Sequence, residues 1–203
     1  MKKIILITIS IIFILNIMFV STFAMTFSDL PSTHWAYDNI ISLADKGVIN
    51  GYTDGTYKPG NAVTRGEFFK LIMVSLYGSE EYFDQNLKSF GHWSMPYAFE
   101  AARNGYLMNG TTVSGLNDEI TRKEMVNILA KICINNKIET AEKVEAISFS
   151  DIDDIDEETK LYIVFVTKNG LINGYTDGTF KPDRTMTRAE VATVISRFLN
   201  LAY

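Results

Sequence analysis

The sequence predicts an all-α protein made of three helix–loop–helix repeats that pack together as one unit. Two observations predict this: the tetrad Thr-Arg-x-Glu opens an apolar stretch three times, and a thirteen-residue loop sequence occurs twice. A single repeat of this size would have only a marginal core, so we expect the three repeats to share one. The tetrads are Thr64–Glu67, Thr121–Glu124 and Thr187–Glu190.

An export signal is predicted over residues 1–24. Lys2 and Lys3 precede an apolar run, and Thr22-Phe23-Ala24 offers a cleavage site. The run is long enough that an uncleaved N-terminal membrane anchor stays open as an alternative. Because residues 1–24 hold two lysines and no acids, their removal would change the net charge from −5 to −7.

Composition and motifs argue against several classes of function. An acidic chain with few clustered basic residues is a poor nucleic-acid binder. The single cysteine, Cys133, cannot form an internal disulfide, and there is no Cys/His metal cluster. His34 and His92 lack a paired carboxylate or nucleophile. We therefore predict no enzyme activity, no cofactor and no metal.

The first and third repeats are the most alike. Residues 47–59 return as residues 170–182 at an offset of 123, and Arg188 follows Arg65 at the same offset. The lead Phe27-Ser28-Asp29 returns as Phe149-Ser150-Asp151 at an offset of 122. Similarity over this length indicates an internal repeat.

The middle repeat is degenerate. Phe90 and Trp93 align with Phe27 and Trp35, but Gly91 and His92 occupy the stretch that contains Asp29 in the first repeat. We place the repeats at residues 25–88, 89–147 and 148–203. The predicted linkers, near residues 79–88 and 139–148, are polar and charged.

Each repeat is predicted to begin with one helix and end with another. The first helix runs from Trp35 to Lys46, and Gly47 is a plausible residue to end it. Ala36, Ile40, Leu43 and Ala44 form its apolar face. The second helices have a clear apolar spacing, seen in Met125, Ile128, Leu129, Ile132 and Cys133 and again in Val191, Val194, Ile195, Phe198 and Leu199.

An arginine follows the threonine of each tetrad. Threonine and the glutamate three residues later form a capping box, which satisfies free N–H groups at a helix start. The arginine adds a positive charge where the helix dipole is already positive, so we expect an anion such as a carboxylate or phosphate to meet it. The alternative is a capping box with a solvated arginine.

These motifs resemble the S-layer homology domain family. The matching features are the Phe-x-Asp lead, the Trp-Ala-Tyr helix start, the Gly-x-Ile-x-Gly-Tyr-x-Asp-Gly-Thr-Tyr/Phe-Lys-Pro loop and Thr-Arg-x-Glu. The resemblance covers essentially all of the chain after residue 24, in three copies. It implies a pseudo-threefold unit around a central three-helix bundle. It also implies grooves between adjacent repeats that bind cell-wall polysaccharide, commonly one bearing a pyruvate ketal.

The resemblance implies polysaccharide-binding roles for ten residues. The arginines would meet the acidic sugar substituent, the aspartates would accept hydrogen bonds from sugar hydroxyls, the tryptophans could lie against a sugar ring, and the glycines would admit the ligand. The purely structural alternatives are core packing for the tryptophans and, for the glycines, turns that need positive φ. The ten are Asp29, Trp35, Gly51, Arg65, Trp93, Gly110, Arg122, Asp151, Gly174 and Arg188.

Two departures weaken the match. Repeat two lacks the aspartate and the Tyr-x-Asp-Gly loop, and Glu158 stands where Trp35 would align. We therefore expect at least one groove to be weak or silent.

The acidic run from Asp151 to Glu158 fails the EF-hand pattern, because position six is Asp156 rather than glycine. We expect this run to place negative charge at a helix start.

The implied function is non-covalent anchoring of an exported protein to the bacterial cell wall through secondary cell-wall polysaccharide with a carboxylate-bearing sugar. We expect a monomer at the cell surface, without nucleic acid. The alternative is a protein–protein interaction module of the cell surface, anchored in the membrane if the signal stays uncleaved.

Overall fold

The described part of the computed structural model is helical. It covers residues 25–107, 114–138 and 148–202. The predicted signal peptide and Gly110 lie outside these residues. The α-helices are α2 (Tyr37–Asp45), α3 (Arg65–Tyr77), α4 (Met95–Arg103), α5 (Arg122–Asn135), α6 (Glu157–Lys168) and α7 (Arg188–Ala202). The prediction of an all-α fold is confirmed.

α3, α5 and α7 each start at a predicted capping box. At α3 and α5 the threonine side chain accepts from the glutamate N–H, and the glutamate side chain accepts from the threonine N–H. At α7, Glu190 Oε2 accepts from the Thr187 N–H at 3.0 Å. Such caps typically contribute about 1 kcal/mol each.

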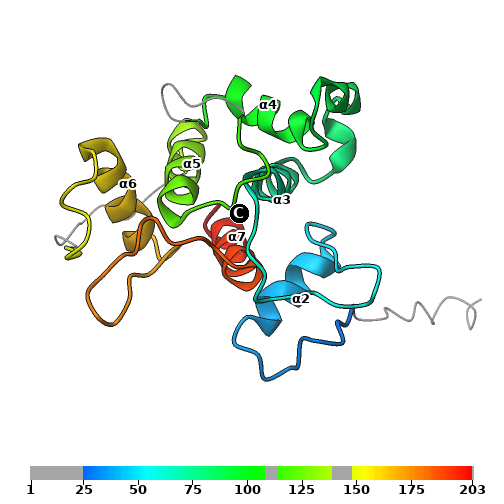
Figure 1. Cartoon of the computed structure of the whole chain (residues 1–203), viewed down its shortest axis with the longest axis horizontal. Coiled ribbons are helices and arrows are strands. Elements are labelled where there is room, and N and C mark those ends of the chain that lie inside the picture. The colour runs from blue at the N-terminus through cyan, green and yellow to red at the C-terminus, as the bar shows by residue number, and fades with distance from the viewer. Residues whose placement is uncertain (1–24, 108–113, 139–147, 203) are drawn as a thin grey trace, which may run out of the picture.

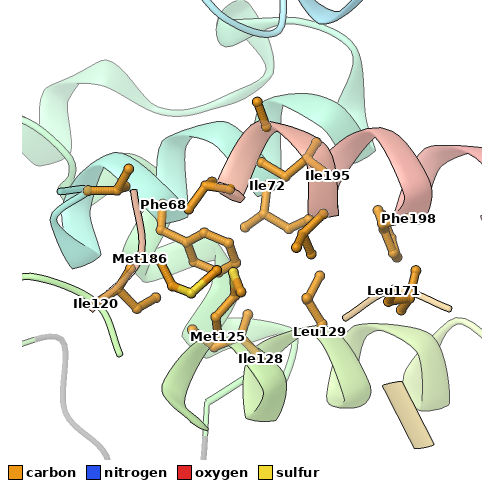
Figure 2. Close-up of a cluster of buried hydrophobic side chains, with 14 of the residues drawn as sticks. Phe68, Ile72, Ile120, Met125, Ile128, Leu129, Leu171, Met186, Ile195 and Phe198 are labelled. Atoms are coloured by element: carbon orange, nitrogen blue, oxygen red, sulfur yellow. The ribbon is translucent and has the colours of Figure 1, made fainter. Parts of the chain in front are cut away.

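α3, α5 and α7 meet at the centre of the molecule, and α2, α4 and α6 lie outside them (Figure 1). Each outer helix packs on one central helix: α4 on α3, α6 on α5 and α2 on α7. The predicted apolar faces are buried, including those of α5 and α7. Figure 2 shows Phe68 and Ile72 of α3, Met125 and Leu129 of α5, and Phe198 of α7 in one cluster.

The segments that precede the three central helices are joined by a closed ring of backbone hydrogen bonds. Val63 N–H donates to Met186 O at 2.9 Å, Met186 N–H to Ile120 O at 3.1 Å, and Ile120 N–H to Val63 O at 2.9 Å. All three residues are almost fully buried. Since each segment holds both others, the three helix starts have fixed positions relative to one another.

The polar linker predicted near residues 79–88 has structure of its own. Two short 3₁₀ helices, η1 (Glu80–Tyr82) and η2 (Gln85–Phe90), occupy it. Phe83 is buried and packs on Tyr97 with ring centroids 4.8 Å apart. The alignment of Phe90 with Phe27 does not predict its burial: Phe90 is 73% exposed, whereas Phe27 is 8% exposed. The shortened lead of this repeat is thus organised differently.

The acidic run before α6 caps that helix, as predicted. Asp156 Oδ1 accepts a hydrogen bond from the Thr159 N–H at 2.9 Å, and Glu157 and Glu158 lie in the first turn. Among the residues that the structure describes, no helix is long and apolar enough to cross a membrane.

Candidate anion-binding sites between repeats

Each predicted arginine begins a central helix and lies beside a loop of another repeat. The backbone N–H of the arginine donates to the carbonyl oxygen of the residue three positions before another capping threonine. This hydrogen bond fixes the helix start against that loop. These bonds run from Arg65 to Asp118, from Arg122 to Arg184 and from Arg188 to Asn61. We refer to the three places as the Arg65 site, the Arg122 site and the Arg188 site.

The Arg122 site holds a buried cation. Arg122 is 5% exposed. Its Nε donates to Phe180 O at 2.8 Å and its Nη2 to Asn173 O at 2.9 Å. The guanidinium carbon lies 4.6 Å from the Phe180 ring centroid and 5.1 Å from that of Tyr175. Carbonyl oxygens and ring faces are only a partial replacement for water around a full charge.

Arg122 has no carboxylate partner among the described residues. Burial lowers its pKa, because the protein interior disfavours the charged form. The side chain nevertheless stays protonated, since arginine does not lose its proton in proteins. Where the structure is described, the one partner of its Nη1 is the Met186 sulfur, at 3.9 Å. This nitrogen can therefore still donate to an anion.

The Arg188 site repeats this geometry with the loop of the first repeat. Arg188 Nε donates to Tyr57 O at 2.8 Å, and Nη2 donates to Asn50 O at 3.1 Å. Its guanidinium carbon lies 4.5 Å from the Tyr57 ring centroid and 5.0 Å from that of Tyr52. Arg188 is only partly buried. The two sites therefore present the same donors at different depths.

The Arg65 site is already neutralised from within. Arg65 Nη2 lies 2.5 Å from Glu124 Oε1, and Nη1 lies 2.8 Å from Asp118 Oδ2. Nη1 also donates to Gly115 O at 3.2 Å. The bonds to Glu124 and Asp118 raise the pKa of Arg65. One arginine against two carboxylates gives a formal charge of −1, so this site does not favour an anionic ligand.

A groove of about 220 Å³ adjoins Arg122. Trp35 and Tyr175 lie along it together with Glu190 and Arg197. It thus combines residues of all three predicted repeats. The larger cavity, of about 350 Å³, adjoins Arg65 and is lined by its partners Asp118 and Glu124. Volume and charge therefore favour different sites.

Both predicted tryptophans lie at the surface. Trp35 is 63% exposed and Trp93 is 43% exposed. The ring of each lies next to the preceding histidine, with centroids 5.6 Å apart. Core packing, the purely structural alternative, is therefore wrong for both tryptophans. An exposed indole beside a groove can lie against an apolar face of a ligand.

The predicted aspartates hold the loops together. Asp29 accepts from the N–H groups of Tyr57 and Lys58 at 2.7 and 2.8 Å. Asp151 accepts from Phe180 and Lys181 at the same two distances. Each carboxylate thereby fixes the carbonyl that receives an arginine Nε. Contact with sugar hydroxyls stays a prediction for both.

Steric contact, rather than positive φ, explains the predicted loop glycines. A Cβ on Gly51 would overlap the Phe27 ring, and one on Gly174 would overlap the Phe149 ring. Neither glycine has positive φ, unlike Gly55 at 79°. The expectation that the turn requires positive φ at Gly51 and Gly174 is therefore wrong.

The residues that distinguish the three sites were not among the predicted site residues. Tyr52 and Tyr175 lie under the guanidinium groups. Asn61, Asp118 and Arg184 carry different charges at equivalent places. Their spacing, three residues before each capping threonine, was visible in the sequence, but nothing in the sequence showed which arginine each would face.

Comparison with known proteins gives a family match for two parts of the chain. Two segments match the S-layer homology domain. They are residues 26–69 and residues 148–192. The S-layer homology segments contain Arg65 and Arg188, whereas Arg122 lies outside both matches. The predicted middle repeat is therefore not part of either match.

Curated relatives extend the similarity over most of the chain. An exoglucanase of Acetivibrio thermocellus is 33% identical over 175 residues, which are 85% of this chain and 16% of that protein. An S-layer protein of Bacillus thuringiensis subsp. finitimus is 25% identical over 85% of this chain and 21% of its own length. A cellulosome-anchoring protein of Acetivibrio thermocellus is 42% identical over 40% of this chain and 18% of its own length. The chain thus matches a small part of each relative.

Proposed function

We propose that this chain is a non-catalytic module that anchors an exported protein to the bacterial cell wall by binding secondary cell-wall polysaccharide. The S-layer homology segments support anchoring in general. The relatives named as S-layer, cell-surface and cellulosome-anchoring proteins support a place at the cell wall or cell surface. Relatives with enzyme names share only a small fraction of their length with it, so their activities do not transfer.

The observation that supports an acidic ligand is the buried charge of Arg122, which has no ion-pair partner among the described residues. Removing a cation from water without an opposite charge costs several kcal/mol. A carboxylate at the groove would supply that charge and accept from Nη1. A pyruvate ketal on a sugar has such a carboxylate, and the exposed indole of Trp35 lies along the same groove.

We further propose that the three repeats, at residues 25–88, 89–147 and 148–203, form one unit with unequal sites. In the described part of the chain Arg122 and Arg188 donate to carbonyl oxygens and have no ion-pair partner, whereas Arg65 is paired with Asp118 and Glu124. Two binding sites on one frame would prolong attachment, because release of one leaves the other at high effective concentration.

The test is a pull-down of residues 25–203 on cell-wall sacculi, before and after chemical removal of the secondary polysaccharide. We expect binding that disappears with the polysaccharide and that falls in Arg122→Ala and Arg188→Ala. Arg103→Ala is the matched control, since Arg103 pairs with Glu100 on the exposed side of α4. Circular dichroism melting checks that each variant is folded.

Three outcomes would contradict the proposal. One is binding that persists without the polysaccharide, which would favour a protein or peptidoglycan partner. The second is no binding by the wild-type chain. The third is unchanged wall binding per folded molecule in both arginine variants with a large loss of melting temperature, which would make the arginines structural.

A further inference from the structure

The three arginine sites differ at one structurally equivalent position. The residue three places before each capping threonine is Asn61, Asp118 or Arg184. In each case its carbonyl oxygen accepts from the backbone N–H of the site arginine. Its backbone therefore holds the same place beside the arginine in every site. The side-chain charge at this position is therefore neutral for Asn61, negative for Asp118 and positive for Arg184.

Asp118 shows what a side chain at this position can do. Its carboxylate lies 2.8 Å from Arg65 Nη1 and occupies the donor that a ligand would need. The same position at the Arg122 site has the opposite charge. The guanidinium carbons of Arg184 and Arg122 lie 5.7 and 5.1 Å from the Tyr175 ring centroid, and Lys181 Nζ lies 4.1 Å from it, so Arg184 adds a third cation to this ring.

Arg184 has capacity for a further partner. One of its terminal nitrogens pairs with Glu190, the capping glutamate of α7. Its Nε is buried and has no hydrogen-bond partner in the described part of the chain. Glu190 compensates one of the two guanidinium groups, and Arg197 also lines the groove. The Arg122 site therefore has an excess of positive charge.

We propose that Arg184 is a specificity-determining residue that makes the Arg122 site the principal acid-binding site of the chain. Asn61 supplies no such additional cation to the Arg188 site, where we expect weaker binding, and Asp118 excludes acidic ligands from the Arg65 site. This inference rests on the proposed function, because it assigns the carboxylate of the polysaccharide to one of its three sites.

The probe is a methyl hexoside that carries a pyruvate ketal, compared with the methyl ester of the same ketal, which has no charge. Calorimetric titration of residues 25–203 gives the ratio of the two affinities. For Arg184→Asn, which reproduces the residue at the Arg188 site, we expect about tenfold weaker binding of the acid and little change for the ester. Arg184→Lys should keep most of the preference for the acid.

Two further variants make the test two-sided. Arg103→Asn removes the same charge far from the groove and should bind like the wild type. Asn61→Arg places a second arginine at the Arg188 site, where Glu67 caps α3 as Glu190 caps α7. We expect this variant to bind the acid more strongly than the wild type. We also expect it to show a second binding site in the calorimetric titration.

The outcomes separate this inference from the proposed function. Equal losses for acid and ester in Arg184→Asn would show a steric role and overturn the inference. So would wild-type binding by Arg184→Asn while Arg122→Ala no longer binds, although the proposed function would stand. If the wild type binds neither the ketal nor sacculi, both fail.

Discussion

Replacement of Gly51 by alanine should destabilise the protein through a clash that the structure locates. The new Cβ would overlap the Phe27 ring and lie 2.8 Å from the backbone oxygen of Thr56. Phe27 is 8% exposed and packs on Tyr57 with ring centroids 5.3 Å apart, so it has little room to move. Overpacking of this kind costs about 1–3 kcal/mol.

The magnitude can be checked by thermal unfolding. For a domain of this size, 1 kcal/mol lowers the melting temperature by about 2–4 °C, so we expect a fall of roughly 2–12 °C. Gly60→Ala is the matched control, because a Cβ there meets nothing within 4 Å and Gly60 lacks positive φ. It should be neutral or slightly stabilising.

A second variant tests the stated cause. If the Phe27 ring is the obstacle, Phe27→Leu should reduce the additional cost of Gly51→Ala, which a double-mutant cycle measures. Melting of Gly51→Ala within about a degree of Gly60→Ala would contradict a clash at this position. Additivity of Gly51→Ala and Phe27→Leu would contradict the assignment of the clash to the Phe27 ring, since residues in contact should couple.

Three other predictions follow from local interactions. Thr121→Ala removes the cap of α5 and should lower the free energy of unfolding by about 1 kcal/mol, measured by urea denaturation. Burial raises the pKa of Cys133 to about 12, so its alkylation by iodoacetamide at pH 8 should be very slow until denaturant is added. Hydrogen bonds from Thr56 and Thr179 lower the pKa of Asp54 and Asp177 to about 2. Because the pKa of each carboxyl group is lower in the folded than in the unfolded chain, both loops should lose stability as the pH falls from about 4 to 2. Carboxyl-carbon NMR should show both groups titrating near pH 2 rather than near pH 4.

The sequence contained enough information for the helices but not for the partners of the arginines. Thr64 and Glu67 are three residues apart, so their capping box is a local property and is visible in a repeat pattern. The pairing of Arg65 with Glu124 joins residues 59 positions apart and depends on which loop faces which helix. The internal neutralisation of the Arg65 site therefore required the three-dimensional structure.

The same limit explains the misjudged glycines and aromatic residues. A loop rich in turn residues predicts positive φ, but Gly51 is required by a ring that arrives from residue 27. Likewise, Phe90 aligns with Phe27 in type and order, yet the short helix η2 leaves it 73% exposed. In both cases, residue type predicted a plausible local role, and packing against a distant segment decided the actual one.

The structural role of Arg122 is compatible with the binding role that we propose for it. Arg122 uses Nε and Nη2 to hold Phe180 O and Asn173 O, which ties the loop before α7 to the start of α5. Within the described residues, those bonds leave Nη1 with a weak sulfur contact alone. The proposed ligand carboxylate would accept from Nη1 without breaking the bonds to the loop. Loss of Arg122 should therefore reduce both stability and binding, so affinity per folded molecule is the quantity that isolates recognition.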